Sequence, residues 1–286
     1  MTVCGALRPV VSLAHPEIPV PHRHPLRLWI VRHGESAGNV AREAAQTAGA
    51  ARIDIPERDV DVPLSALGHR QAEALGHWFA AMPEDERPNL LLASPYRRAV
   101  ETAQAIRAAG GLAPDAQPLR LDERLREKEF GILDRLTRAG IEEFHPEQAV
   151  LRSDLGKFYH RPPGGESWCD VILRLRSALD TISLHHDGQR VLVVAHQVVV
   201  LCLRYLLEDM DEAQILGIDA EGDVANCGVT EYAFSADAAP ASGLALVRYN
   251  FVAPLEAQGT TVTSEPDPND AAQPLSHDPG RERDIP

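Results

Sequence analysis

The sequence predicts an α/β fold in three layers (α/β/α), with a mostly parallel sheet between two layers of helices. Two observations predict it. Short apolar runs of strand length alternate along the chain with longer stretches in which apolar residues recur at helical spacing. The two strongest apolar runs also end directly in charged and polar residues, as strands do where an α/β sheet binds its ligand.

Strands are expected at 26–31, 90–93 and 190–195. The first run reads Leu-Arg-Leu-Trp-Ile-Val and the last reads Arg-Val-Leu-Val-Val-Ala. Continuous aliphatic and β-branched runs of this length are typical of strands that are buried on both faces.

Helices are expected between and after these strands. At 64–81 the apolar residues follow a helical period, and Ser65 is suited to cap the helix N-terminus. The same spacing predicts helices at 96–109 and 168–185, and the turn after the first strand is expected to enter a helix near 36–39.

One folded domain is expected over 26–253, between two ends that lack core-forming residues. Residues 1–25 are rich in proline and histidine without periodicity, which predicts a flexible arm. Residues 254–286 contain few large apolar side chains and cannot offset their ordering entropy, which predicts a disordered tail.

The charge balance limits the partners. The 286 residues include 28 Lys+Arg and 42 Asp+Glu, a formal net charge of −14. Such a surface repels nucleic acid and anionic membranes, so neither is expected as a partner. The longest apolar stretch, 191–207, contains His196, Gln197 and Arg204 and is not expected to span a bilayer.

The N-terminus has no signal-peptide pattern, and the four cysteines form no CxxC pair. We therefore expect a cytoplasmic protein with reduced thiols and with Cys202 in the core. The sequence predicts no oligomeric state.

Polar residues follow the strong strands. Arg32, His33 and Gly34 come after the first, and His196 and Gln197 come after the last. Because the carboxyl ends of parallel strands meet at one edge of a sheet, the two histidines are expected to share a site.

A second basic element, Arg97 and Arg98, follows the 90–93 strand. With Arg32 and the helix N-termini it indicates a phosphate pocket. Taken singly, the arginines also fit solvated surface charges, and His33 also fits a buried core histidine.

Five segments, in order, resemble signatures of the histidine phosphatase (phosphoglycerate mutase-like) superfamily. They are Arg-His-Gly-Glu-Ser at 32–36 with Asn39, and the segments 63–72, 94–103, 125–131 and 193–196. The resemblance covers about 26–234 and implies a phosphoglycerate mutase-like fold. It places the family arginine at Arg98 rather than Arg97.

The resemblance implies a role for each matched residue. His33 would attack phosphorus to give a phosphohistidine, and Glu127 would protonate the leaving alkoxide. The residues expected to hold the phosphoryl oxygens are Arg32, Arg98, a protonated His196, Asn39 and the helix start at Ser36.

Two alternatives concern the site itself. Without the resemblance, Glu123 and Glu129 in the same charged run are nearly equal candidates for the acid. A metal bound by His33 and His196 is not expected, because no third ligand has suitable spacing and the arginines repel a cation. No cofactor is expected.

The stretch 151–202 resembles the bisphosphatase half of bifunctional phosphofructokinase-2/fructose-2,6-bisphosphatase. The residues that this resemblance assigns to a sugar phosphate are Arg152, Lys157, Trp168 and Gln197. Arg161 would join Arg152 and Lys157 in a basic rim for a second anionic group. The alternative for 152–161 is an exposed basic loop. Trp168 stands in place of a tyrosine and Leu201 in place of an arginine, so fructose 2,6-bisphosphate is only one candidate substrate. No GxxxxGK[ST] phosphate loop occurs in the chain.

The predicted function is metal-independent hydrolysis of a phosphomonoester of a small metabolite through a phosphohistidine. Two alternatives stay open. A phosphoglycerate-type mutase would return the phosphoryl group to a bound intermediate at the same site. A non-catalytic module would bind a phosphorylated ligand on the same fold.

Overall fold

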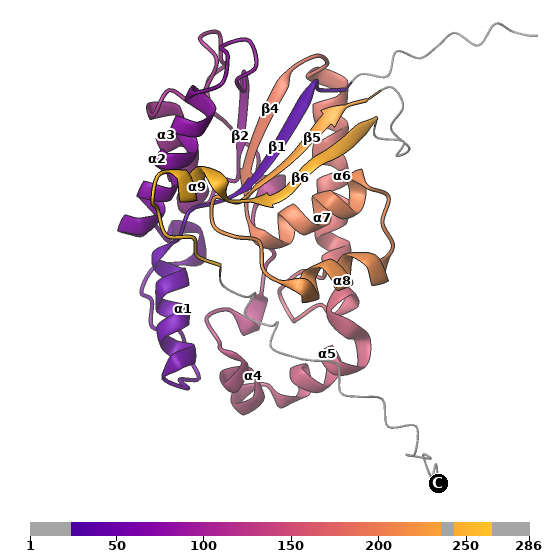
Figure 1. Cartoon of the computed structure of the whole chain (residues 1–286). Coiled ribbons are helices and arrows are strands. Elements are labelled where there is room, and N and C mark those ends of the chain that lie inside the picture. Colours follow the sequence, from indigo (N-terminus) through magenta and orange to yellow (C-terminus); the bar gives the residue numbers. More distant parts are fainter. Residues whose placement is uncertain (1–23, 236–242, 265–286) are drawn as a thin grey trace, which may run out of the picture.

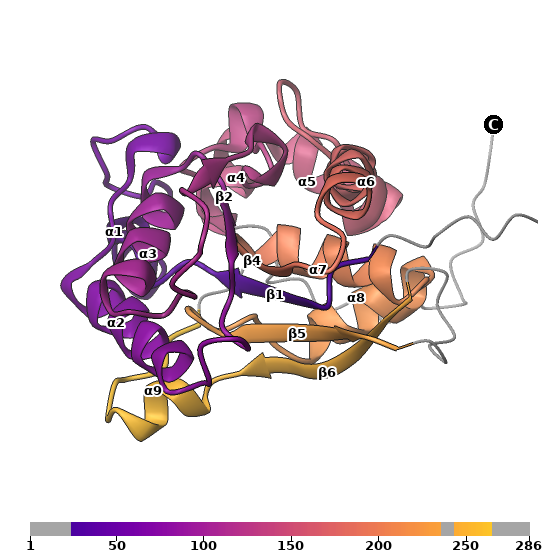
Figure 2. The same cartoon turned by 90° about the horizontal axis from the view of Figure 1, so that it is seen from above.

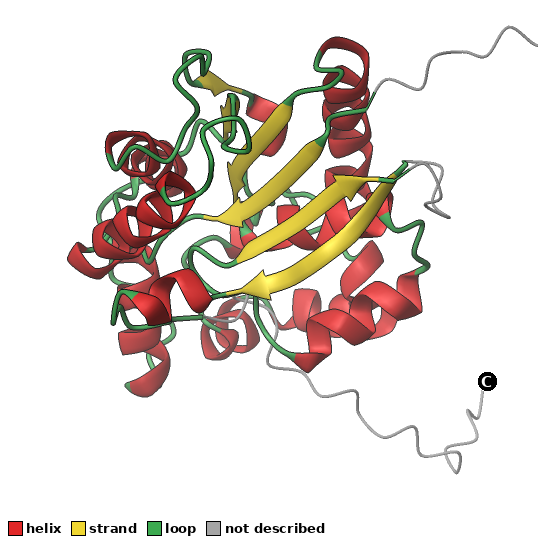
Figure 3. Ribbon diagram, turned by 45° about the horizontal axis from the view of Figure 1, so that its top comes forward, coloured by secondary structure: helices red, strands yellow, loops and turns green. Residues whose placement is uncertain are grey.

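A single six-stranded sheet, ordered β3-β2-β4-β1-β5-β6, lies at the centre of the computed structural model, which describes residues 24–235 and 243–264 (Figure 1). The strands are β1 (Arg27–Arg32), β2 (Leu90–Ala93), β3 (Arg120–Leu121), β4 (Arg190–Ala195), β5 (Val229–Phe234) and β6 (Leu244–Phe251). Strands β1 to β4 run parallel, whereas β5 is antiparallel to β1 and to β6. The prediction of a mostly parallel sheet is confirmed, and Figure 3 shows its twist.

The helices that the structure describes cover both faces of this sheet (Figure 2). They are α1 (Ala37–Thr47), α2 (Ala66–Ala80), α3 (Arg97–Ala108), α4 (Arg138–Phe144), α5 (Pro146–Tyr159), α6 (Trp168–His185), α7 (Gln197–Leu207), α8 (Glu212–Glu221) and α9 (Ala253–Ala257). The three strands and three helices predicted from apolar periodicity are present, with ends that differ by one or two residues.

Alternation along β1 explains the two helical layers. Leu28 and Ile30 pack into one core with α6, α7 and α8, while Trp29 and Val31 pack into the other with α2, α3 and α9. All four side chains are at most 1% exposed. A strand whose successive side chains enter different cores is apolar without interruption, which is why the 26–31 run is continuous.

The C-terminal boundary expected at residue 254 is wrong. Helix α9 begins at Ala253 and buries Leu255 completely, and the backbone N–H of Asn226 donates to the Thr263 carbonyl at 2.8 Å. These contacts are made with distant segments, so the local composition that predicted disorder did not reveal them. The rest of the expected tail, 265–286, lies outside the described residues.

The N-terminal boundary expected at residue 26 also differs from the structure, because residue 24 already contacts the folded domain. His24 stacks on Phe234 with ring centroids 5.9 Å apart, and its backbone N–H donates to Asp187. Residues 1–23 lie outside the described part of the chain.

Within the described ranges, no helix combines the length and apolar character needed to cross a bilayer. Cys202 is fully buried in the core, as predicted. Cys169, Cys202 and Cys227 are free thiols, and Cys4 lies outside the described residues.

Candidate active site

A pocket opens where the carboxyl ends of β1 and β4 meet. Its walls come from the end of β1 and the turn after it, from α1, from the first turn of α3, from the start of α7 and from the segments 59–62 and 127–134. The lining residues are Arg32, His33, Ser36, Gly38, Asn39, Arg42, Asp59, Val62, Arg98, Glu127, Phe130, Asp134, Gln197 and Val198.

The two histidines meet beside this pocket: His33 is part of the lining, and the fully buried His196 lies against it without being a lining residue. Parallel pairing sets Arg32 opposite Ala195, so His33 and His196 are the next residues on neighbouring strands. Their ring centroids are 5.1 Å apart, and the backbone N–H of His33 donates to the Ala195 carbonyl at 2.9 Å. The structure therefore brings together the two side chains that the strand ends were expected to bring together.

Close backbone packing fixes the loop that carries His33. A Cβ on Gly34 would lie 2.5 Å from the Gly68 carbonyl oxygen, so a larger residue does not fit between the loop and α2. The N–H of Gly34 donates to Thr102 Oγ1 at 3.0 Å, and the N–H of Glu35 donates to Gln71 Oε1 at 2.8 Å.

The hydrogen bonds of His33 fix its tautomer. Nδ1 lies 2.7 Å from the Gly34 carbonyl oxygen, which can only accept, so Nδ1 carries the proton. Nε2 then has a lone pair, and it accepts from Arg98 Nε at 3.1 Å. The imidazole thus presents a nucleophilic nitrogen toward the guanidinium groups of the pocket.

Arg98 also pairs with Asp59. It lies in the first turn of α3 and its Nη1 is 2.9 Å from Asp59 Oδ1, while the guanidinium stands over the Tyr96 ring at 5.0 Å. Arg32 is 4% exposed and its Nη1 donates to the Val224 carbonyl. Both guanidinium groups are buried with fixed orientations, which favours the binding of a planar or tetrahedral oxyanion.

Helix α1 presents its N-terminus to the pocket. Ser36 is the N-cap, and its hydroxyl accepts from the Asn39 N–H at 3.1 Å while Asn39 Oδ1 accepts from the Ser36 N–H at 2.9 Å. This capping box holds the oxygen of the Asn39 amide, so the amide nitrogen is the group left to meet an anion.

The two ring nitrogens of His196 differ in their hydrogen bonding. Its Nε2 is 2.8 Å from Ser94 Oγ, but its Nδ1 is buried and has no hydrogen-bond partner among the described residues. Burial, and then the charge of Arg98, hold the pKa of His196 well below 6.5. Both effects favour the neutral imidazole, and the protonated form that was expected while a phosphoryl group is bound stays a prediction.

Burial and the charges of Arg98 and Arg32 lower the pKa of His33 in the same way. Because the folded protein keeps both imidazoles neutral while the unfolded chain protonates them, the free energy of unfolding must fall as the pH drops below about 6.5. The slope is about 1.4 kcal/mol per pH unit for each imidazole.

We expect the double variant His33→Gln/His196→Gln to lose this part of the acid dependence in urea unfolding between pH 7 and 5 in phosphate-free buffer. His69→Gln, at an exposed position on α2, is the matched control and should keep the wild-type slope. Equal slopes in wild type and double variant would contradict the neutral imidazoles.

Of the three candidate acids, only Glu127 lines the pocket. It follows the 3-10 helix Glu123–Leu125, and Arg174 Nη2 donates to its backbone carbonyl at 3.2 Å. Glu129 instead accepts from the Tyr96 hydroxyl at 2.9 Å, and Glu123 is exposed. The geometry separates residues that local sequence could not.

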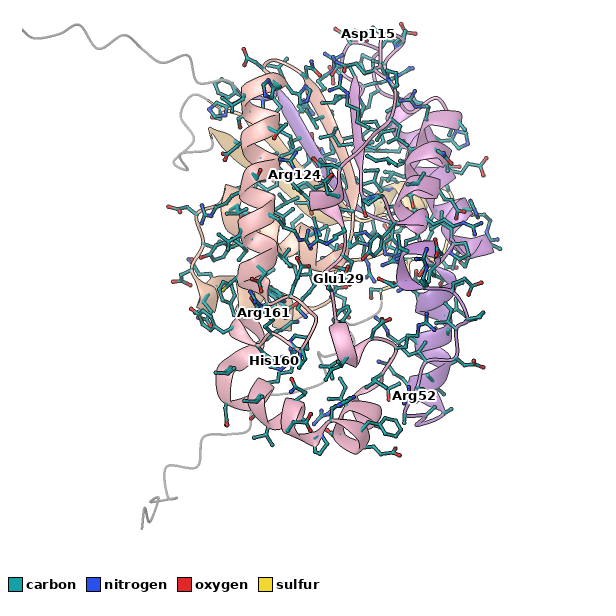
Figure 4. The ribbon with its side chains drawn as sticks, turned by 180° about the vertical axis from the view of Figure 1, so that it is seen from behind. Arg52, Asp115, Arg124, Glu129, His160 and Arg161 are labelled. Atoms are coloured by element: carbon teal, nitrogen blue, oxygen red, sulfur yellow. The ribbon has the colours of Figure 1, made fainter. Side chains whose placement is uncertain are left out.

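The predicted basic rim does not reach the pocket. Lys157 Nζ pairs with Asp219 at 2.6 Å, and Arg161 pairs with Asp170 at the start of α6. Residues 146–159 form α5 rather than the alternative loop, and neither Arg152 nor the other two basic residues lines the pocket. Figure 4 shows Arg161 beside His160, on the side of the molecule away from α1.

Trp168 is fully buried beneath Lys157, with the ammonium 5.1 Å from its ring. It is a core residue and does not line the pocket. Gln197 does line it, as expected, and its Nε2 donates to Asp223 at 2.8 Å.

Sequence reasoning missed Arg42, Asp59 and Asp134, which line the pocket. Arg42 carried a usable signal, because it stands three residues after Asn39 and so shares its helix face. The two aspartates carried none, since their place depends on how two loops fold back over the sheet. Among the described residues, no group of three His, Cys, Asp or Glu side chains is arranged to hold a metal.

Known proteins share this architecture. The chain is 32% identical over 180 residues to a probable phosphoglycerate mutase, GpmB, of Yersinia enterocolitica, covering 62% of this chain and 73% of the relative. It is 29% identical over 192 residues to 6-phosphofructo-2-kinase/fructose-2,6-bisphosphatase of Gallus gallus, covering 67% of this chain but only 35% of that protein.

The solved structure of mycobacterial glucosyl-3-phosphoglycerate phosphatase with inorganic phosphate superposes with a TM-score of 0.58 at 25% identity. The superposition covers 80% of this chain and 98% of that one. The sequence model of the histidine phosphatase superfamily (branch 1) matches residues 28–244. The chain therefore belongs to that superfamily.

Proposed function

We propose that this protein hydrolyses phosphomonoesters of small metabolites through a phosphohistidine at His33 Nε2. The observation that carries the proposal is the tautomer of His33. Its Nδ1 proton is held by the Gly34 carbonyl, and its Nε2 lone pair faces Arg98 at 3.1 Å inside the pocket. A nucleophile needs an unprotonated nitrogen, which this tautomer supplies. When a phosphoryl oxygen accepts the N–H of Arg98, the Nε2 lone pair is released and the guanidinium neutralises charge on the target.

The first step forms the bond between Nε2 and phosphorus and breaks the bond from phosphorus to the ester oxygen. Glu127, protonated before the step, gives its proton to the leaving alkoxide. Arg32 and Arg98 stabilise the phosphoryl oxygens, and a bound dianion would raise the pKa of the neighbouring His196, so that this imidazole becomes a donor.

The second step returns the enzyme to its resting state. Glu127, now a carboxylate, takes a proton from water as the water oxygen attacks phosphorus, and the bond from phosphorus to Nε2 breaks. Inorganic phosphate leaves, and the ion pair between Arg98 and Asp59 forms again.

The relatives support this reaction class, since one solved relative is a phosphatase with bound inorganic phosphate. We further propose a cytoplasmic location, which the free thiols of Cys169, Cys202 and Cys227 support. A mutase is the second candidate, favoured by the similarity to a probable phosphoglycerate mutase.

The experiment that tests the proposal follows two products. With p-nitrophenyl phosphate, we expect phosphate release at the same rate in excess EDTA, because the guanidinium groups supply the positive charge that a metal would supply elsewhere. With 3-phosphoglycerate, free phosphate without isomer supports hydrolysis, and isomer without phosphate supports the mutase. Loss in EDTA that a metal restores would contradict the metal-independent mechanism.

A further inference from the structure

We infer that the substrate carries a single phosphate, and that its alcohol part bears hydrogen-bond donors and no second anionic group. This inference rests on the proposed function and names the class of substrate for the same pocket. It depends on three features that the mechanism does not use: the carboxylates of Asp59 and Asp134, the amide oxygen of Gln197, and the absence of the expected basic rim from the lining.

The cations of the pocket gather at His33. Arg98 contacts its Nε2, and the charges of Arg32 and Arg42 both act on its imidazole. They balance the phosphoryl group, which must bind at Nε2. The pocket therefore uses its positive charge at the reacting phosphate.

Besides Glu127, the lining carries two carboxylates, those of Asp59 and Asp134, which cannot hold the phosphoryl group. Asp134 is exposed in the pocket wall, with Arg135 3.7 Å away as its ion-pair partner. Burial and the charges of Asp59 and Glu129 raise the pKa of Asp134, because these carboxylates lie close enough to repel one another. When phosphate takes the donors of Arg98, Asp59 also loses its counter-charge, so this wall becomes more negative.

Gln197 adds a neutral acceptor to that wall. The side chain is 4% exposed, and its Nε2 donates to Asp223, which fixes the orientation of the amide. Its Oε1 is buried without a hydrogen-bond partner in the described part of the chain. A buried acceptor without a donor is costly, and a hydroxyl or ammonium group of the substrate would satisfy it.

The guanidinium groups among the described lining residues are those of Arg32, Arg42 and Arg98, and all three act at His33, where the reacting phosphate binds. Lys157 and Arg161 are engaged by Asp219 and Asp170 outside the pocket. A second phosphate or a carboxylate would instead meet Asp59 and Asp134. Donor-bearing alcohols, whether polyols or amino alcohols, fit the acceptors that these residues present.

Four three-carbon phosphomonoesters test the inference, since they differ mainly at the far end of the carbon chain. They are sn-glycerol 3-phosphate, 3-aminopropyl phosphate, n-propyl phosphate and 3-phosphoglycerate. We expect kcat/KM for the hydroxyl or ammonium compound to exceed that for 3-phosphoglycerate and for n-propyl phosphate by about tenfold. The two donor compounds show whether hydroxyl or ammonium is preferred.

Asp134→Asn should lower the ratio of kcat/KM for glycerol 3-phosphate to kcat/KM for 3-phosphoglycerate by about fivefold, because it removes one charge that repels the carboxylate. Asp115→Asn is the matched control. It makes the same change in net charge at an exposed position at the far end of the molecule (Figure 4), and it should leave the ratio unchanged.

The outcomes separate this inference from the proposed function. If wild type hydrolyses 3-phosphoglycerate as well as glycerol 3-phosphate, or if Asp134→Asn leaves the ratio unchanged, the inference is overturned and the phosphatase assignment stands. If neither the four esters nor p-nitrophenyl phosphate is hydrolysed, the proposed function itself fails, and this inference fails with it.

Discussion

Replacement of His33 by alanine is expected to abolish turnover and the phosphoenzyme together. The side chain supplies the lone pair that faces the guanidinium group of Arg98, with Nε2 3.1 Å from Arg98 Nε. Removing a covalent nucleophile leaves only phosphate binding and electrostatic stabilisation by the pocket. The expected loss in kcat is about 10⁴-fold or more.

The measurement combines steady-state rates with trapping of the intermediate. After a rapid quench of enzyme mixed with labelled substrate, wild type should carry a phosphoryl label that acid removes and base does not. His33→Ala should carry none. His69→Ala removes an exposed imidazole on α2, 3.9 Å from Glu101, and should keep both rate and label.

Two results would contradict the assignment. A full rate in His33→Ala would mean that the pocket binds phosphate esters without using this imidazole. An acid-labile label that persists in the variant would place the nucleophile elsewhere, with His196 the neighbouring imidazole, 5.1 Å from the ring of His33.

The sequence was sufficient for residues whose place depends on strand order alone. Periodicity predicted β1 and β4, and the rule that ligands bind at strand carboxyl ends predicted that His33 and His196 meet. Their 5.1 Å separation follows from parallel pairing of β1 with β4. No side-chain detail was needed, since one residue beyond each paired strand end is already close to its neighbour.

The sequence was insufficient where long-range contacts decide the outcome. Residues 254–264 are polar in composition, but Thr263 Oγ1 donates to Asn226 Oδ1 at 2.9 Å, and Asn226 Nδ2 donates to the His33 carbonyl at 3.0 Å. Local composition predicted disorder for a segment that supports the loop of His33. No pattern within the segment encodes that contact.

The prediction that a basic rim lines the pocket was wrong for a related reason. The resemblance assigned Arg152 and Lys157 to the substrate, and adding Arg161 to them assumed that charge at all three positions faces the substrate. Here acidic partners stand on α6 and α8, and each ion pair holds its cation outside the pocket. Opposite charges brought together by helix packing override the role suggested by position.

Replacement of Glu127 by glutamine is expected to slow alkyl phosphates far more than aryl phosphates. Glutamine keeps the size of the side chain but has no carboxyl proton to give to a leaving alkoxide. General acid catalysis contributes about 10²- to 10⁴-fold, so kcat/KM for glycerol 3-phosphate should fall by that factor. A nitrophenolate leaves without protonation, so formation of the phosphoenzyme from p-nitrophenyl phosphate should change little.

The same carboxylate is proposed to activate water in the second step, and this predicts a kinetic signature that a structural defect does not produce. In stopped flow, Glu127→Gln should release one equivalent of nitrophenol in a burst and then turn over slowly, because the phosphohistidine accumulates. Glu129→Gln and Glu123→Gln make the same substitution in the same charged run, outside the pocket lining, and should show neither effect. Equal losses on alkyl and aryl substrates without a burst would remove Glu127 from both roles, and the same pattern in Glu129→Gln would transfer them to that residue. The burst therefore tests the proton transfer independently of phosphate binding, since a misfolded or empty pocket cannot produce a stoichiometric first turnover.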